Sequence, residues 1–274
     1  IGTTNGLDYF DSQRGKFVHF RKDVNNPQSL TSNSVTSIYE DRGGTLWIGT
    51  ADGLNRLDGT SRQFTRYRHD PNDLNTMNDN YIKAISEDQS GTLWIGTNNG
   101  VNKFDRQWSR FSRYVNDPKN LASLSGNRVN AIQSEPSGTV WIGTHGGGLN
   151  KVDRNKEQFA HIVRDPNKPA SLSNNFVWSI FEDGKGFLWI GTDDGLNKLD
   201  RRTGTATHYV NNPRDPHSLS NNVVYSILET RTGDFWVGTD RGLNLLDRKS
   251  DRFTRFSGNA NDTTALASGA NFTL

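Results

Sequence analysis

The segment His145-Gly146-Gly147-Gly148 is the first place in this sequence to look for catalytic chemistry. A histidine followed by glycines can form the oxyanion hole of an esterase, which also needs a nucleophilic serine in a Gly-x-Ser-x-Gly turn between a strand and a helix. The sequence contains no Gly-x-Ser-x-Gly motif and no cysteine. We therefore expect no catalytic residue, and His145 remains of interest as a titratable side chain on a loop.

Carboxylates are the second candidate, because pairs of them carry out glycoside hydrolysis. They recur at matching positions along the chain, as Glu40-Asp41, Glu87-Asp88, Glu182-Asp183 and Glu229. A catalytic pair should occur once, whereas carboxylates in most copies are expected to accept backbone hydrogen bonds in turns. Four Asp-Pro pairs could supply calcium ligands but are also ordinary turn starters: Asp70-Pro71, Asp117-Pro118, Asp165-Pro166 and Asp215-Pro216. We expect turns at these places, with no metal ion and no cofactor.

These motifs belong to a sequence repeat that recurs every 47 or 48 residues. Its centre is a tryptophan followed by Ile-Gly-Thr or Val-Gly-Thr, at Trp47, Trp94, Trp141, Trp189 and Trp236. A fixed period of this length indicates a solenoid, a propeller or a repeat array, whose units need their neighbours to bury an apolar face. The single 48-residue step results from one extra glycine after His145, which makes the esterase interpretation unnecessary.

One repeat predicts four short antiparallel strands, at residues 34–39, 46–50, 54–57 and 64–68. Alternating β-branched residues indicate the strands, and Asp52-Gly53 indicates a tight hairpin in which glycine supplies a positive φ. Four strands at this interval predict a blade of an all-β propeller. We expect each repeated tryptophan to lie in the blade core. Charged residues on the fourth strand are expected to protect an exposed edge: Arg66, Arg68, Arg113 and Arg255.

The repeat predicts a single β-propeller domain over residues 1–274. Its copies lie near 1–32 (partial), 33–79, 80–126, 127–174, 175–221 and 222–268. If residues 270–274 add a closing strand beside the first copy, the ring has six blades, one of them shared between the chain ends. The alternative is a fragment of a larger ring.

The pattern Asn-x-Val-x-Ser-Ile-x-Glu-Asp-x-x-Gly-x-Leu-Trp-Ile-Gly-Thr-x-x-Gly-Leu-Asn-x-Leu-Asp resembles the two-component regulator propeller repeat, most closely at Asn175 to Asp200. Members of that family carry such repeats in the extracytoplasmic sensor part of bacterial receptors that end in histidine kinases, hybrid regulators or diguanylate cyclases. Several respond to carbohydrates. The resemblance implies a periplasmic or extracellular sensing module. Family rings commonly have seven blades, so the five full copies here depart from that pattern.

Positions that differ between copies are free for recognition, whereas positions that are alike maintain the fold. The copies differ most at the start of the first strand, where alternation places two side chains on one side. We expect these residues and the hairpin histidine to line the channel mouth and bind a small molecule or oligosaccharide: Tyr81, Lys83, Arg128, Asn130, His145, Phe176, Trp178 and Tyr225. The alternative is that these side chains only fill a narrow channel.

Composition narrows the remaining possibilities. A formal net charge of +2 with no basic tract excludes a nucleic-acid surface. No apolar run reaches 18 residues, so we expect membrane attachment only through segments outside this chain. Three functions remain: a non-catalytic sensor, a scaffold for a protein partner or a homodimer through a propeller face, and a propeller lyase or glycosidase. The symmetric carboxylates and the absence of a triad disfavour the enzyme.

Overall fold

The computed structural model describes residues 1–153 and 156–257, and this part of the chain is all-β. It contains no helix, and so none long and apolar enough to cross a membrane. The chain forms two compact units. Unit 1 comprises Ile1–Val140 and Asp153–Gln158, and unit 2 comprises Trp141–Val152 and the residues from Phe159 onward.

Twenty-three strands build the described structure. The first thirteen strands are β1 (Gly2–Thr3), β2 (Gly6–Asp11), β3 (Lys16–Phe20), β4 (Val35–Glu40), β5 (Leu46–Thr50), β6 (Gly53–Leu57), β7 (Phe64–Tyr67), β8 (Ile82–Glu87), β9 (Leu93–Thr97), β10 (Gly100–Asp105), β11 (Arg110–Tyr114), β12 (Val129–Ser134) and β13 (Val140–Thr144). The remaining strands are β14 (Gly148–Asp153), β15 (Gln158–Ile162), β16 (Val177–Glu182), β17 (Leu188–Thr192), β18 (Gly195–Asp200), β19 (Thr205–Tyr209), β20 (Val224–Glu229), β21 (Phe235–Thr239), β22 (Gly242–Asp247) and β23 (Arg252–Phe256).

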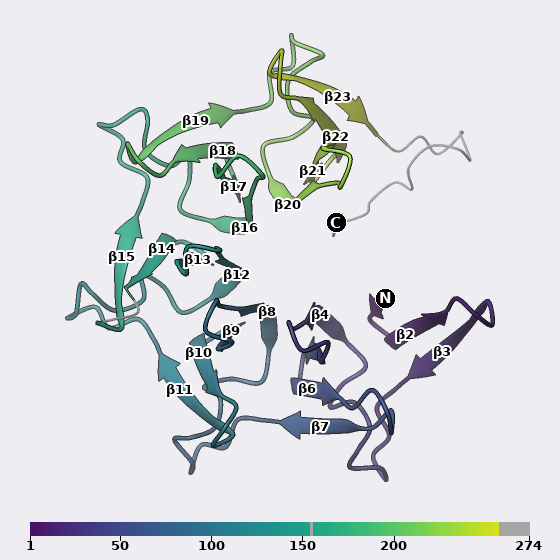
Figure 1. The fold of residues 1–274 in the computed structure, drawn as a ribbon. Coiled ribbons are helices and arrows are strands. Elements are labelled where there is room, and N and C mark those ends of the chain that lie inside the picture. The colour runs from purple at the N-terminus through teal and green to yellow at the C-terminus, as the bar shows by residue number, and fades with distance from the viewer. Residues whose placement is uncertain (154–155, 258–274) are drawn as a thin grey trace. The chain divides into compact units, whose positions relative to one another are not determined.

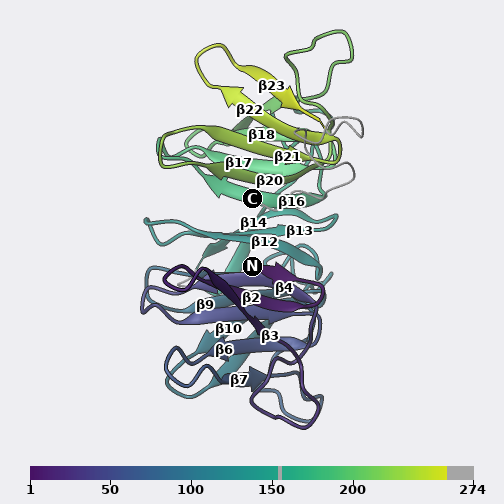
Figure 2. The same ribbon diagram turned by 90° about the vertical axis from the view of Figure 1, so that its right-hand side faces the viewer.

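The strands form six antiparallel sheets in sequence order, as blades of a β-propeller do (Figure 1). Sheet β1-β2-β3 has three strands, and the other five have four each: β4 to β7, β8 to β11, β12 to β15, β16 to β19 and β20 to β23. The boundary between the two units falls within the sheet of β12 to β15. Figure 2 shows the same sheets from the side.

The predicted strands agree with β4 to β7 to within one residue at each end, and the all-β propeller fold is confirmed. Six sheets match the predicted six blades, and the first, partial copy contributes the three-stranded sheet. The proposed closing strand at 270–274 lies outside the described residues. The single domain and its repeat boundaries stay predictions.

The repeated tryptophans form the core of the sheets in four of the five cases. Trp47, Trp94, Trp141 and Trp189 are at most 3% exposed. Trp47 packs edge-on against Phe104 of the following sheet, with ring centroids 5.6 Å apart. Trp236 differs from the prediction, because it is only half-buried. In the described chain no sheet follows β23, so nothing there covers this indole as Phe235 covers Trp189.

The repeated aspartate after the first strand organises the next turn. Asp41 accepts hydrogen bonds from the backbone N–H groups of Gly43 and Thr45 and from the indole Nε1 of Trp47, at 3.0, 2.9 and 2.8 Å. Asp88 and Asp183 make the same contacts with their own turns and indoles. This confirms the structural interpretation of these aspartates.

The repeated glutamate joins neighbouring sheets. Glu87 Oε2 accepts the backbone N–H of Arg42 in the preceding sheet at 2.8 Å, and its Oε1 pairs with Arg106 at 2.8 Å. In unit 2, Glu229 binds Gly184 N and Arg248 in the same way, at 3.2 and 2.5 Å. These carboxylates are therefore occupied in binding one sheet to the next, which confirms their structural role.

The glycine after Trp-Ile is required by packing between sheets. A Cβ on Gly96 would lie 2.5 Å from Cγ1 of Val129 in the next sheet, and a Cβ on Gly143 would lie equally close to Val177. Real Cβ atoms do not approach that closely, so the absent side chain is what allows the second strand of one sheet to pack against the first strand of the next. Gly53, in the hairpin, has φ 131°, as predicted.

The Thr and Asn of the repeat form a buried hydrogen-bonded network that we did not anticipate. Thr31 N–H donates to Asn55 Oδ1 and Asn55 Nδ2 donates to Thr31 Oγ1, both at 2.9 Å, and the Thr31 and Thr50 hydroxyls are also 2.9 Å apart. Thr50 and Asn55 are fully buried. The network anchors the loop between two sheets, since buried polar groups need partners.

The arginines of the fourth strands correct the sequence analysis, because three of the four are not edge-protecting charges. Arg113 donates from Nε to Thr76 O at 2.6 Å and from its terminal nitrogen to Asp73 O at 2.6 Å and to Thr76 Oγ1 at 2.9 Å. Arg66 and Arg255 bind the loops before their sheets in the same way. A guanidinium satisfies several carbonyls at once, so these residues tie each loop to the next outer strand. Arg68 instead pairs with Asp52 at the surface.

The Asp-Pro loops are turns, as predicted. In each, the aspartate Oδ1 accepts the backbone N–H two residues later, from Asn72, Lys119, Asn167 and His217. These carboxylates are therefore satisfied locally.

Candidate ligand-binding site

A β-bulge interrupts the first strand of the sheets at the position that varies most between copies. Pairing shifts register between Val35 and Ser37 of β4, and the same shift occurs in β8, β16 and β20. The extra residues in the bulges are Thr36, Lys83, Trp178 and Tyr225, and the last three of these are predicted binding residues. A bulge turns the side chain of its extra residue out of the regular alternation of a strand. The variable residues therefore lie where the backbone departs from regular strand geometry.

In unit 2 the predicted residues form a continuous set of rings, the aromatic cluster (His145, Phe176, Trp178 and Tyr225). The His145 ring meets Phe176 at 4.5 Å and Trp178 at 5.4 Å between centroids, both edge-to-face. Trp178 meets Tyr225 at 5.3 Å, also edge-to-face. Phe176 is 37% exposed, so part of the cluster is open to solvent.

The enlarged hairpin between β13 and β14 brings the histidine into this cluster. His145 pairs with Phe176 as an isolated antiparallel bridge. Gly146 and Gly148 donate their backbone N–H groups to Asn175 O at 3.1 and 2.9 Å. Gly146 has φ 92°, a conformation that favours glycine, so the extra glycine serves the hairpin that carries His145.

Carboxylates border the aromatic cluster. Trp178 donates its indole N–H to Asp193 Oδ1 at 2.5 Å, and Asp193 donates its backbone N–H to Phe176 O at 3.2 Å. Burial raises the pKa of the Tyr225 hydroxyl, and the charges of Asp240 and Asp193 raise it further. Rings and acceptor oxygens therefore lie together, which suits a ligand with hydroxyl groups.

In unit 1 a separate basic group (Lys83, Arg128 and Asn130) gathers on β8 and β12 and the residue before it. Lys83 Nζ donates to Asn130 Oδ1 at 3.1 Å. Burial lowers the pKa of Lys83, and the positive charge of Arg128 lowers it further. Tyr81, the fourth residue predicted here, is 38% exposed, and its N–H donates to Asp79 Oδ1 at 2.6 Å. The structure thus brings together three of the four predicted residues of unit 1 and all four of unit 2.

Sequence reasoning missed residues that the structure places beside these groups. Asp193, the acceptor of the Trp178 indole, is one of them. At the other end of β8 and β12, away from the basic group, the hydroxyls of Ser86 and Ser134 are 3.0 Å apart, a pair that the repeat pattern did not predict. Both serines interrupt the repeat, and that interruption was the available signal.

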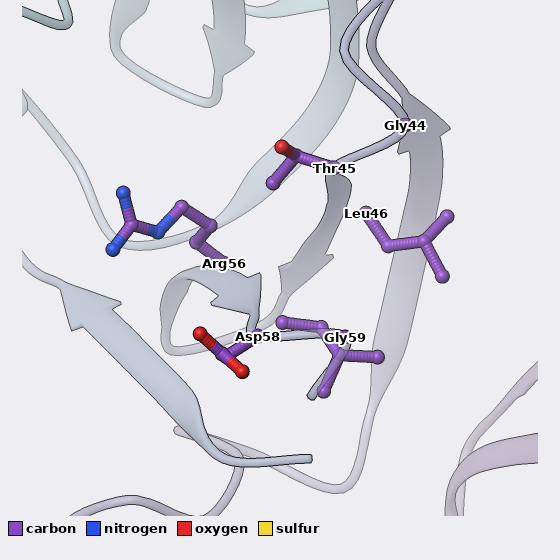
Figure 3. Close-up of a pocket in the computed structure, with 7 residues that line it drawn as sticks. Gly44, Thr45, Leu46, Arg56, Asp58 and Gly59 are labelled. Carbon is purple, nitrogen blue, oxygen red and sulfur yellow. The ribbon is translucent and has the colours of Figure 1, made fainter. Parts of the chain in front are cut away.

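A further depression lies at the turn end of the sheet β4 to β7 (Figure 3). Its volume is about 340 Å³, and Thr45 and Leu46 at the start of β5 border it together with Arg56 and Asp58 at the end of β6. Gly59 stands where other copies have Arg106, Arg201 and Arg248, so the arginine that pairs with the repeated glutamate is missing from this sheet. Across residues 1–153 and 156–257, no three His, Cys, Asp or Glu side chains converge on a possible metal position.

The repeat is matched by the sequence model described as "two component regulator propeller", at residues 29–52, 76–99, 123–146, 171–194 and 218–241. The chain belongs to the two-component regulator propeller repeat family. Each matched segment of this family runs from the loop before the first strand to the hairpin after the second. It therefore includes the turn aspartate or its substitute and the tryptophan, and in four of the five segments it includes a bulged residue. No curated protein matches the chain by sequence.

Solved structures share the propeller fold of this family member. The extracellular domain of the putative hybrid two component system BT3049 from B. thetaiotaomicron aligns with a TM-score of 0.80 at 23% identity, covering 98% of this chain and 34% of that one. The extracellular domain of the putative one component system BT4673, from the same organism, aligns with a TM-score of 0.65 at 22% identity, covering 94% and 41%. Virginiamycin B lyase from Staphylococcus aureus aligns with a TM-score of 0.68 at 12% identity, covering 97% of this chain and 82% of that one. The chain thus spans less than half of each of the two extracellular domains.

Proposed function

We propose that this chain is a non-catalytic, ligand-sensing propeller module of a bacterial signal-transduction receptor, lying in the periplasm or outside the cell. Membership of the two-component regulator propeller repeat family supports this proposal. So do the BT3049 and BT4673 structures, which are extracellular domains of putative two component and one component systems.

The observation that carries the proposal is the aromatic cluster of unit 2. Bulges present Trp178 and Tyr225 at the position where the copies differ, and the enlarged hairpin adds His145 to them. Sugar rings stack on aromatic side chains, and sugar hydroxyls donate to carboxylates such as Asp193 and Asp240. We infer that the ligand class is a carbohydrate.

The basic group of unit 1 offers a second set of ligand-binding side chains. Arg128 is exposed, and Lys83 is directed to Asn130 by a hydrogen bond. Their donors would suit hydroxyl or acidic groups. The exposed ring of Tyr81 lies two residues from Lys83 and would add a stacking surface.

Thermal melting against a panel of neutral and acidic oligosaccharides tests this function. A ligand that binds only the folded chain raises the melting temperature by mass action. The variants Trp178→Ala and Tyr225→Ala should lose the response while remaining folded. Trp108→Ala is the matched control, because Trp108 is 65% exposed in unit 1 and outside both groups.

Two results would contradict the proposal. Severe unfolding of both variants would mean that the aromatic cluster only fills space in the core. No response to any saccharide, together with a concentration-dependent dimer in light scattering, would favour the scaffold that binds a second copy or another protein.

A further inference from the structure

A cavity of about 550 Å³ lies within unit 1 at the C-terminal ends of β4, β8 and β12, and in β4 and β8 this is the end opposite the bulge. Ser86 and Ser134 line it, and their hydroxyls are hydrogen-bonded to each other at 3.0 Å. We call it the serine pocket. Arg42, Glu87, Gln89 and Glu135 also line it.

The serine pocket exists because two residues break the repeat with small side chains. Ser134 is the last residue of β12, where the other complete copies end the first strand with glutamate: Glu40, Glu87, Glu182 and Glu229. Ser86 is the next-to-last residue of β8, where the other copies have Tyr39, Gln133, Phe181 and Leu228. The two short side chains face each other, so the space that a glutamate would fill is left open.

The other sheets show what a carboxylate does at this place. Glu87 accepts the N–H of Arg42, the residue after the turn aspartate of the preceding sheet. Glu229 accepts the N–H of Gly184, which stands at the same point of its own turn. The equivalent donor for β12 is the N–H of Gln89, and Ser134 is too short to serve it as a glutamate would. Within the described part of the chain, this N–H has no hydrogen-bond acceptor.

A cation borders the same opening. Arg42 donates from its guanidinium to Gln89 O at 3.0 Å, which holds the positive charge next to the Gln89 N–H. The two acidic neighbours are already engaged: Glu87 by Arg106 and Arg42 N–H, and Glu135 by the Ser137 hydroxyl at 2.8 Å.

We propose that the serine pocket binds the carboxylate of a small organic acid, which takes the place of the missing glutamate. The carboxylate accepts the N–H of Gln89 and pairs with Arg42, while the hydroxyls of Ser86 and Ser134 and the amide of Gln133 serve the rest of the molecule. This site lies in unit 1 and is independent of the aromatic cluster.

Calorimetric titration and thermal melting of the whole chain at constant ionic strength test the site. The probes are sodium acetate, D-glucuronate and L-glutamate, with D-glucose and L-glutamine as neutral counterparts. We expect the carboxylates to bind and raise the melting temperature and the neutral compounds to have no effect. Tighter binding of D-glucuronate or of L-glutamate identifies the acid as a sugar acid or an amino acid.

Two variants give the decisive comparison. Ser134→Glu supplies the carboxylate from the chain itself, so it should raise the melting temperature and weaken acid binding at least about tenfold. Arg42→Gln keeps the backbone and should weaken binding by a similar factor, about that of one charge-assisted hydrogen bond. Ser112→Glu makes the same charge change on the exposed side of β11 and should behave as the wild type.

The inference is overturned if the carboxylates do not bind, if the neutral compounds bind equally well, or if Ser134→Glu binds acids as the wild type does. Trp178→Ala should leave acid binding unchanged. Failure of the serine pocket is therefore distinguishable from failure of the proposed saccharide site.

Discussion

The indole N–H of Trp47 donates to the carboxylate of Asp41 at 2.8 Å, and both residues are at most 3% exposed. This hydrogen bond joins the core of a sheet to the turn that precedes its second strand. Asp88 with Trp94 and Asp183 with Trp189 repeat it at 2.9 Å. The repeat thus conserves within one chain a unit in which a buried carboxylate fixes both the turn and the indole.

Replacement of Asp41 by alanine should lower the free energy of unfolding by about 2–4 kcal/mol, since it leaves an indole and two backbone N–H groups without an acceptor. The ion pair with Arg106 is lost as well. Urea denaturation measures the change. Asp52→Ala is the control, because Asp52 pairs with Arg68 and Lys22 at the surface. This substitution should lower the free energy of unfolding by less than about 1 kcal/mol. Equal losses in the two variants would contradict this assignment.

Asp41 should also make stability depend on acid pH. Burial acts to raise its pKa, but hydrogen bonds from Trp47 and Thr45 and the charge of Arg106 lower it overall, below the usual 3.8. The stabilisation is therefore complete above pH 3.8 and is lost as the pH falls through the lower folded-state pKa. Urea denaturation of the wild type and Asp41→Asn at pH 7, 5 and 3 should show their difference shrinking only at the lowest pH. A difference that stays constant would exclude this role.

Local patterns were sufficient to predict the strands and the hairpin. Alternation and turn residues act within a few positions, so residues 46–50 match β5 and Gly53 has its positive φ. Repetition alone assigned Glu87 and Asp41 to structure, because a residue present in most copies serves most copies. It could not assign Trp236, whose burial depends on whether another sheet packs against its own.

Long-range contacts could not be predicted, because they join residues that only folding brings together. Arg113 binds carbonyls 37 and 40 positions earlier, so its charge appeared to belong to a solvent-exposed edge. Asn55 donates a hydrogen bond to a loop residue 24 positions earlier. A polar residue in a predicted strand does not by itself indicate that it belongs to a buried hydrogen-bonded network. The bulge at Trp178 depends on pairing register, which one strand does not reveal. The sequence predicted which residues form the aromatic cluster, but it did not predict which of their rings are in contact.

Glycine at position 96 should be intolerant of any side chain. A Cβ there would lie 2.5 Å from Cγ1 of Val129, so Gly96→Ala should cost about 1–3 kcal/mol of unfolding free energy through overpacking. Gly59→Ala is the matched control, because no atom lies within 4 Å of its added Cβ, and it should change stability by less than about 0.5 kcal/mol. Combining Gly96→Ala with Val129→Ala should cost less than the sum of the single variants. Additive losses would show that the two sheets do not meet at this contact.

Arg113 should be required to hold the loop before β8, although it lies on the outer strand β11. Replacing it by alanine removes three hydrogen bonds to Asp73 and Thr76. We expect faster hydrogen exchange at the backbone N–H groups of these two residues, which bond within the loop, and a loss of about 2 kcal/mol in the free energy of unfolding. Arg110→Ala removes the same charge from an exposed position on the same strand and should leave exchange in the loop unchanged. If both variants accelerate exchange equally, the effect comes from net charge, and the arginine does not anchor the loop.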